Sequence, residues 1–490
     1  MAIGKLKVGA AKLSITPTAD MFPLGAMVGA YEGVREGEEI NVRAIIIDNG
    51  ERVFLLEGFE LGGVPCPDVL RPALEEKYGI KQENMLLTGT HNHSAPHVAG
   101  GTRPGDVSEP RPVEDNVRAY TNLVLKNSVD VVGLAMQNMK PAKYGYGEGK
   151  SYINVNRDQP FDDGYWMQGM NWEGCSDKTL GVIKFVDEED NLIAAVLNYA
   201  MHSTTSFCTL DVDGKVKVTC DAPGIACNLV EAYYGNDAVV LWQSGAAGNQ
   251  NPYYVGIMQV FDKDGVMRER RRLPGAAYEQ GVVFGQQHGM DAIRALKAID
   301  AKKDKMKITT VDSTLYFPTQ RFPHDKFDWA YHRLVVDNLL EWSGHVTAEE
   351  PMPEKKLADM IPCEEKAPMK TQLVLLGDIA IYGVACELYN DIGVQCKEAS
   401  PFKHTMIATH IGDPAVGYIL DDGSVGHKVF QSFGLVGAGG NDEIVVNGML
   451  EMFDEALLFP FSSFGPRHRL PGAWTGERES VFIPTGVITW

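Results

Sequence analysis

The sequence predicts a mixed α/β fold in which β-sheets are layered between helices. Short apolar runs recur along the 490 residues; some are joined by tight turns and others are followed by helical periodicity. Strands joined by turns pair antiparallel and strands followed by helices pair in parallel, so the two patterns together predict mixed sheets. We interpret 1–490 as a single domain with an insertion or lid at about 318–370, where polar and Pro-rich stretches interrupt the periodic pattern.

The first half of the chain opens with a weakly alternating strand that ends at Pro17. The pair Asn49-Gly50 lies between two apolar runs, which is a strong hairpin signal. A helix with Asp68 as its N-cap follows, and then a buried strand and a long periodic helix. The predicted ranges are strand 7–16, strands 42–48 and 52–58, helix 68–78, strand 85–90 and helix 113–139.

In the second half, the acidic turn 187–191 joins two further strands, and strands then alternate with helices. The last thirty residues carry three prolines, so we expect them to wrap the surface. The predicted ranges are strands 180–186 and 192–200, helix 222–234, strand 238–242, helix 276–299, a helix at 327–340 inside the insertion, strands 373–376 and 379–385, a helix from about Glu387, strand 404–410 and helix 443–457.

Composition excludes several classes of function. The net charge of −20 argues against a nucleic-acid partner, because phosphate binding needs clustered cations. No run of about 18 apolar residues predicts a membrane span, and the N-terminus has no apolar signal-peptide core, so we expect a cytoplasmic protein. The eight cysteines form no Cys-x-x-Cys pair and are expected to be free thiols. A homo-oligomer is possible, but the sequence does not set the oligomeric state.

The most informative segment holds His91, His93 and His97, three of the twelve histidines in the chain. They follow the strand predicted at 85–90, and imidazole is both the commonest zinc ligand and a proton carrier near neutral pH. On an extended segment, His91 and His93 point to the same face, so one can hold a metal while the other reaches what the metal binds. The alternative is a polar loop with scattered histidines.

Two other predicted strand ends deliver polar residues, His202 and Glu387. Two histidines and one glutamate are a common zinc ligand set that leaves a position open for water. The alternative is that each residue is structural, since a single strand-end histidine is more often hydrogen-bonded in the fold and a glutamate at a helix start more often interacts with the helix dipole. Segment 243–252 follows the strand at 238–242, and its small residues permit a close backbone approach to a ligand, or else form a tight structural turn.

Several motifs in order resemble the neutral/alkaline, non-lysosomal ceramidase family, in particular its N-terminal zinc-hydrolase domain. The His91 segment resembles the family's Thr-His-Thr-His-Ser-Gly-Pro. The matching segments are Val8-Gly9-Ala10-Ala11 with Ile15-Thr16-Pro17, Val42-Arg43-Ala44, Thr90-His91-Asn92-His93-Ser94-Ala95-Pro96, Asn154-Val155-Asn156-Arg157, Asn198-Tyr199-Ala200-Met201-His202-Ser203-Thr204, Asp221-Ala222-Pro223-Gly224, and Gly245-Ala246-Ala247-Gly248-Asn249-Gln250-Asn251-Pro252.

The resemblance implies one Zn²⁺ per chain, held by His91, His202, Glu387 and Tyr418. It also implies that His93 is the catalytic histidine and that Arg157 contacts the substrate. The fold it implies, paired mixed sheets flanked by helices, agrees with the fold class predicted from the pattern of elements.

The departures from the family pattern concern the substrate. Asn249 and Asn251 stand where the family has Asp and often Ser. Phe430 or Phe433 stands where a second tyrosine is expected, with His427 nearby. His97 replaces a glycine. We also expect the family's C-terminal immunoglobulin-like domain to be absent. We therefore expect zinc chemistry on a different substrate, with Arg157, His97, Asn249 and Asn251 as substrate-binding candidates.

Our first hypothesis is a zinc-dependent hydrolase of an amide or ester bond in a small soluble, possibly carbohydrate-derived substrate. Zinc would activate water, and His93 would act as general base and then general acid. The second hypothesis is a zinc-dependent lyase or isomerase that acts on a sugar derivative through an enolate, with His93 as the base. The third is a zinc-binding protein without catalysis, which would leave His93 idle.

Overall fold

The structure is a computed structural model of the whole chain. It describes residues 4–457 apart from 27–28, 100–112, 161–165, 208, 236, 254–256, 262–266, 273, 321–365, 413–416, 426, 428–430, 432–435 and 438. Most of the predicted insertion, with its helix at 327–340, lies outside the described residues, as do Phe430, Phe433 and the last thirty residues.

The N-terminal sheet has the strand order β6-β5-β4-β1-β7 and is mixed, since β5 and β6 pair in parallel and the other pairs are antiparallel. Helices α1 (Pro67–Tyr78) and α2 (Asp115–Gln137) cover its outer face. The strands are β1 (Lys7–Ser14), β4 (Asn41–Asp48), β5 (Val53–Phe59), β6 (Met85–Gly89) and β7 (Lys140–Pro141).

The central sheet has the order β13-β12-β11-β8, with β12 and β13 parallel and the other pairs antiparallel. Helices α3 (Asp221–Tyr234) and α4 (Ala276–Ala298) pack on each other and on this sheet. Its strands are β8 (Lys143–Lys150), β11 (Thr179–Val186), β12 (Leu192–Tyr199) and β13 (Val239–Ser244).

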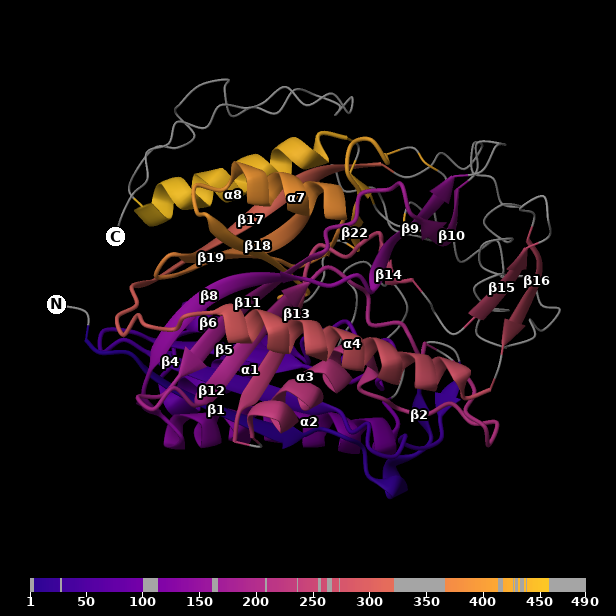
Figure 1. Cartoon of the computed structure of the whole chain (residues 1–490), viewed down its shortest axis with the longest axis horizontal. Helices are drawn as coiled ribbons and strands as arrows, with labels where there is room; N and C mark the ends of the chain where they lie inside the picture. The colour runs from indigo at the N-terminus through magenta and orange to yellow at the C-terminus, as the bar shows by residue number, and fades with distance from the viewer. Residues whose placement is uncertain are drawn as a thin grey trace.

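The third sheet has the order β21-β19-β18-β17-β23, and only its β19–β21 pair is parallel. Helices α7 (Asn390–Ala399) and α8 (Asn441–Leu457) cover it on the outer side opposite to α1–α4 (Figure 1). The strands are β17 (Ile308–Gln320), β18 (Lys366–Leu376), β19 (Ile379–Val384), β21 (His404–Thr409) and β23 (Val436–Gly437).

Smaller elements complete the described part of the fold. A three-stranded sheet has the order β10-β9-β14, and three strand pairs are β2–β3, β15–β16 and the parallel β20–β22. Their bounds, with the two 3₁₀ turns, are η1 (Ala19–Met21), β2 (Leu24–Gly25), β3 (Ala30–Tyr31), η2 (Gln82–Asn84), β9 (Asn154–Pro160), β10 (Trp166–Asn171), β14 (Gln250–Pro252), β15 (Ile257–Phe261), β16 (Met267–Arg272), β20 (Glu387–Leu388) and β22 (Tyr418–Ile419).

The main apolar core lies between the three large sheets. Residues such as Leu56, Ile183 and Ile381, one from each sheet, belong to the same fully buried cluster. Separate apolar clusters lie between each sheet and its pair of helices. The predicted fold class, mixed sheets layered between helices, is therefore confirmed.

Most predicted elements that lie in the described residues are present within a few residues, and the Asn49-Gly50 hairpin joins β4 to β5. The strand predicted at 373–376 is longer, because β18 begins at Lys366, inside the range predicted as an insertion. Two predictions were wrong. The N-cap of α1 is Cys66, and Asp68 lies in the first turn, because Pro67 already occupies the first helical position. Glu387 begins the short strand β20, and the helix starts three residues later at Asn390.

Two further expectations concern cysteines and membrane spans. Among the described residues, six cysteines are free, and four of them are buried: Cys220, Cys227, Cys386 and Cys396. Within the same residues, every helix is too short or too polar to cross a lipid bilayer.

Parallel pairing determines where the functional residues gather. In each parallel pair the carboxyl ends of both strands meet at the same edge of a sheet, and each large sheet contains one such pair. The segments after β6, β12, β13, β19 and β21 therefore leave their sheets at such edges, as in other α/β folds with sites at strand carboxyl ends. His91, His202, Glu387 and His410 lie in or directly beside these segments.

A buried charge network ties this end of the N-terminal sheet to α3. The Arg43 side chain is 3% exposed; its Nε donates to Glu231 Oε1 at 2.9 Å, and its other nitrogens bind Glu60 and Asn228. Lys12 adds a second cation to Glu231 at 2.5 Å. Both carboxylates are buried, so Arg43 compensates the charge of Glu60, and Arg43 and Lys12 together compensate that of Glu231.

We expect Arg43→Leu to lower the free energy of unfolding by about 3–5 kcal/mol, because the substitution leaves Glu60 without its cation in a buried environment. Urea denaturation at pH 7 measures the change. Lys126→Met is the matched control, since it removes an exposed ion pair with Asp130 and should change stability little. A loss in Arg43→Leu no larger than in the control would contradict the prediction.

Another buried carboxylate is that of Glu38, which contacts Thr219 and Arg35. Its Oε2 accepts a hydrogen bond from Thr219 Oγ1 at 2.5 Å, and Arg35 Nε lies 3.2 Å from its Oε1. Burial raises the pKa of Glu38 from 4.5 to about 7, despite the opposing effects of Thr219 and Arg35. The folded protein therefore binds this proton more tightly than the unfolded chain does.

This difference predicts a pH dependence of stability. The contribution of Glu38 is fully present below about 4.5 and is lost as the pH rises through about 7. Relative to Glu38→Gln, the wild-type protein should lose up to about 3 kcal/mol of unfolding free energy over that window. Denaturant titrations of both proteins at several pH values measure the difference, and a constant difference would show that Glu38 titrates at its ordinary pKa.

Candidate metal centre

His91 and His93 lie in a turn that follows β6. His91 adopts a left-handed backbone conformation with φ of 56°, so the segment is not the extended one expected from the sequence. The two rings nevertheless meet, with His91 Nε2 and His93 Nε2 2.9 Å apart. A turn, rather than the alternation of an extended strand, therefore brings the two rings to the same side.

His202 follows β12 and is fixed by one backbone carbonyl. Both its amide nitrogen and its ring Nδ1 lie 3.0 Å from the Gln250 oxygen. Its Nε2 then faces Glu387, 3.0 Å from Oε2, and the same oxygen lies 3.4 Å from His91 Nε2. The structure therefore brings His91, His202 and Glu387 to one point.

The chemistry of these donors fits a divalent metal. His91 Nδ1 lies 3.0 Å from the Gly62 carbonyl, as His202 Nδ1 lies from Gln250. A carbonyl only accepts hydrogen bonds, so each Nδ1 carries the proton and each Nε2 keeps its lone pair toward the centre. Ring nitrogens of His91, His93 and His202 all lie within 4.8 Å of one another, a spacing that a metal can bridge.

The electrostatics of the centre favour neutral rings at His93 and His202. Burial, together with Arg157, lowers the pKa of His202 to about 3. Burial and the neighbouring His91 and His202 rings hold the pKa of His93 well below its usual range. At neutral pH His93 and His202 can therefore act as a ligand or as a base.

Tyr418 and Arg157 lie beside Glu387. Strand β20 pairs with β22 so that Glu387 lies opposite Tyr418. Arg157 is 2% exposed, and its guanidinium donates to the Tyr418 hydroxyl at 3.1 Å, to Asn251 Oδ1 at 3.1 Å and to the Gly248 carbonyl at 2.5 Å. Burial, and then Glu387, raises the pKa of the Tyr418 hydroxyl.

The glycine-containing turn 245–252 supports the centre through backbone contacts. Gly248 N donates to Leu388 O at 2.8 Å, and a Cβ at Gly248 would lie 2.7 Å from Glu387 O. Here the absence of a side chain allows the turn to pack against the strand that carries Glu387, which is the structural alternative to a close approach of a ligand.

Three residues predicted to bind substrate occupy different positions. Asn251 contacts Arg157, as described above. Asn249 Oδ1 accepts hydrogen bonds from Asn390 N and Gln250 Nε2, both at 3.0 Å, so its amide joins the turn to the start of α7. His97 is exposed. Substrate binding by these residues stays a prediction.

One residue at the centre was missed. His410 follows β21, is 5% exposed and stacks on His91 with ring centroids 4.0 Å apart and an interplanar angle of 13°. The predicted strand at 404–410 ends on this histidine, as the strand before His91 ends near a histidine. The same strand-end argument that selected His202 could therefore have found it.

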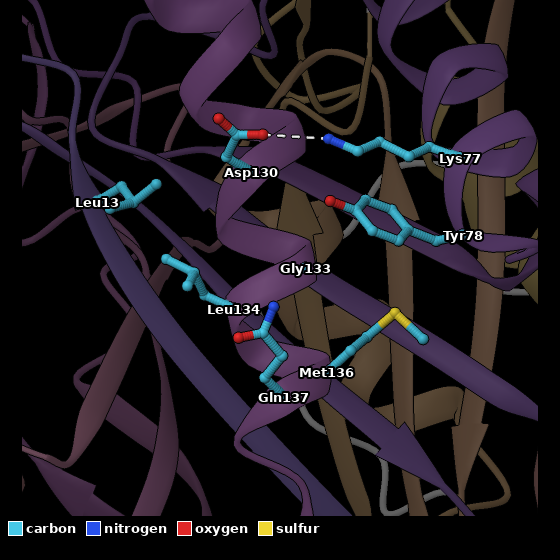
Figure 2. A pocket seen from close by; sticks show the side chains of 8 residues that line it. All are labelled: Leu13, Lys77, Tyr78, Asp130, Gly133, Leu134, Met136 and Gln137. Carbon is cyan, nitrogen blue, oxygen red and sulfur yellow. Dashed lines mark hydrogen bonds and ion pairs between the residues drawn. The ribbon is translucent and has the colours of Figure 1, made fainter.

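A surface hollow of about 650 Å³ lies elsewhere, at α1, α2 and β1 (Figure 2). Lys77 pairs with Asp130 across it at 3.1 Å, and Tyr78, Gly133 and Met136 also line it. None of the residues of the candidate metal centre lines this hollow, so it adds nothing to the site.

Comparisons with known proteins give a structural likeness without a sequence match. No protein-family model matches the chain, and no curated protein matches it by sequence. The crystal structure of neutral ceramidase from Pseudomonas aeruginosa matches with a TM-score of 0.64 at 16% identity, over 94% of this chain and 76% of that one. A ceramidase structure described as complexed with C2 matches with a TM-score of 0.61 at 16% identity, over 98% of this chain and 78% of that one. The chain thus has the fold of the neutral ceramidases, as the motifs of its sequence predict, at a sequence identity of only 16%.

Proposed function

We propose that this chain is a metal-dependent hydrolase of an amide or ester bond in a small soluble substrate. The observation that carries the proposal is the meeting of His91, His93, His202 and Glu387 at buried strand ends. Three imidazoles and a carboxylate with few other partners are costly to bury unless they bind something. The ceramidase fold adds support, because its neighbours are enzymes whose names denote cleavage of an amide.

In this proposal, His91, His202, Glu387 and Tyr418 would hold one divalent metal, with zinc the best fit to a set of nitrogen and oxygen donors. When bound, such a metal supplies Lewis-acid polarisation of a carbonyl and of water. The protein orients His91 and His202 through the Gly62 and Gln250 carbonyls, which leaves their Nε2 atoms toward Glu387.

His93 is the proton carrier in this assignment. Its Nε2 contacts the His91 ring edge, so it lies beside the ligand set, and its buried ring is neutral at pH 7. A neutral imidazole there takes a proton from the attacking water and returns it to the departing nitrogen or oxygen. Arg157, already held by Asn251 and Gly248, presents a fixed guanidinium that orients a substrate carbonyl or hydroxyl.

The substrate is assigned from the departures in the sequence. Asn249 and Asn251 replace the acidic and hydroxyl residues of the family turn, and phenylalanine stands where a second tyrosine is expected. A hydroxyl contact that suits ceramide is therefore absent from the sequence pattern, so we assign a small polar amide or ester instead.

The two neighbouring histidines should differ in kind. We expect His91→Ala to lose both metal and activity, because it removes a metal ligand. We expect His93→Ala to keep one metal per chain while its activity falls about 10²–10⁴-fold, because it removes the proton carrier. Elemental analysis and a rate assay measure the two effects. Equal metal loss in both variants would make His93 a third histidine ligand, which the 4.8 Å cluster of His91, His93 and His202 also permits.

The substrate assignment is tested by direct comparison. We expect small N-acyl and O-acyl sugar derivatives to be hydrolysed faster than short-chain or long-chain ceramides at equal enzyme concentration, and a chelator to abolish the reaction until Zn²⁺ is restored. Ceramide cleavage with kcat/KM on the order of 10⁴ M⁻¹s⁻¹ or better would contradict the assignment. Release of an unsaturated sugar without a free acid would instead favour a lyase.

A further inference from the structure

Asn92 lies between the two histidines of the centre, and its side chain makes three hydrogen bonds inside the protein. Its Nδ2 donates to Glu60 O at 3.2 Å and to Thr219 O at 2.8 Å, and its Oδ1 accepts from Ser94 N at 2.8 Å. The side chain is 1% exposed. Asn92 therefore spends both of its amide hydrogens on the protein, while the rings of its two neighbours meet at the centre.

These bonds join the histidine turn to two separate parts of the fold. Glu60 follows β5 in the N-terminal sheet, and Thr219 precedes α3. The backbone supports the same attachment, because Asn92 N donates to Leu61 O at 3.0 Å and Thr219 N donates to Ser94 O at 3.1 Å. The turn is thus held from both sides, although His91 is in a left-handed conformation that is uncommon for residues other than glycine.

We propose that Asn92 is a positioning residue that fixes the relative placement of His91 and His93. This inference rests on the proposed function, in which one ring binds metal and its neighbour moves a proton. The Nε2 atoms lie 2.9 Å apart in a non-extended segment, so small changes in the turn would separate them. Side chains that hold the ligands of a metal in place commonly change its affinity about 10–100-fold when removed.

Two substitutions separate the parts of this role. Asn92→Ala removes all three hydrogen bonds and leaves the buried carbonyls of Glu60 and Thr219 without these donors. Asn92→Thr keeps an oxygen near Ser94 N, as threonine does in local turns, but cannot reach both carbonyls. Threonine is also the residue at this place in the ceramidase pattern that the segment resembles, so it is the conservative replacement.

The chain offers a matched control at the opposite end of β5. Asn49, in the β4–β5 turn, is 2% exposed and also makes three hydrogen bonds: its Nδ2 donates to Met306 O at 2.9 Å, and its Oδ1 accepts from Glu51 N at 3.0 Å and from Arg52 N at 2.8 Å. The strand between the two sites is long enough to separate them by roughly 20 Å. Asn49→Ala should therefore destabilise the protein without disturbing the centre.

Thermal unfolding of the full-length protein is measured by circular dichroism. The dissociation constant for Zn²⁺ is then measured by competition with a chromophoric chelator, at a temperature where each variant is folded. We expect both alanine variants to unfold at lower temperature. Only Asn92→Ala should bind zinc about 10–100-fold more weakly, and Asn92→Thr should fall between it and the wild type. If Asn92→Ala does not fold, weaker zinc binding by folded Asn92→Thr supports the inference.

Each contrary outcome has a distinct meaning. If folded Asn92→Ala binds zinc as tightly as the wild type, the positioning role is overturned and the proposed function is left intact. If only Asn92→Thr folds, the same result in that variant has the same meaning. An equal loss of affinity in Asn49→Ala overturns the positioning role as well, because the effect would then follow general stability. A wild-type protein that binds no zinc overturns the proposed function and this inference together.

Discussion

The centre depends on burying neutral imidazoles where strand ends of several sheets meet. A histidine kept neutral in a buried place has to donate one ring proton, and the protein supplies a fixed acceptor for each of two rings, the Gly62 carbonyl for His91 and the Gln250 carbonyl for His202. With the tautomers set in this way, both Nε2 lone pairs point toward Glu387. The three groups then form one donor set although they come from three separate segments.

The surrounding structure holds these segments at fixed separations. Glu60 is the clearest link, because its carboxylate is bound by Arg43 inside the sheet while its backbone carbonyl accepts the amide of Asn92. The buried charge network and the histidine turn are therefore joined through one residue. On the other side, Gly248 allows the turn 245–252 to lie directly against β20, and the same turn supplies the carbonyl of Gln250 to His202.

The fold and the site carry different kinds of information about function. A likeness at 16% identity establishes the arrangement of sheets and helices but not the substrate, because many chemistries share one fold. The proposed metal-dependent function rests on the donor set at the strand ends. Arg157 extends this set, since its guanidinium is bound to the Tyr418 hydroxyl on one side and to Asn251 on the other.

The sequence by itself determined the fold class, the positions of the helices and of many strands, and the identity of the principal candidate residues; β8 and β17 were not predicted. Local signals suffice there: Asn49-Gly50 specifies a hairpin, and an apolar run that ends in a histidine marks a strand end. Short strands such as β14, β20 and β22 carry too few residues for a periodic signal, and so the pairing of Glu387 with Tyr418 was not visible. Only the tertiary structure showed that the strand ends converge, that His410 stacks on His91, and that Asn249 bonds to the start of α7. Those contacts join residues that are distant in sequence, and their geometry is set by sheet pairing and packing, which local patterns do not encode.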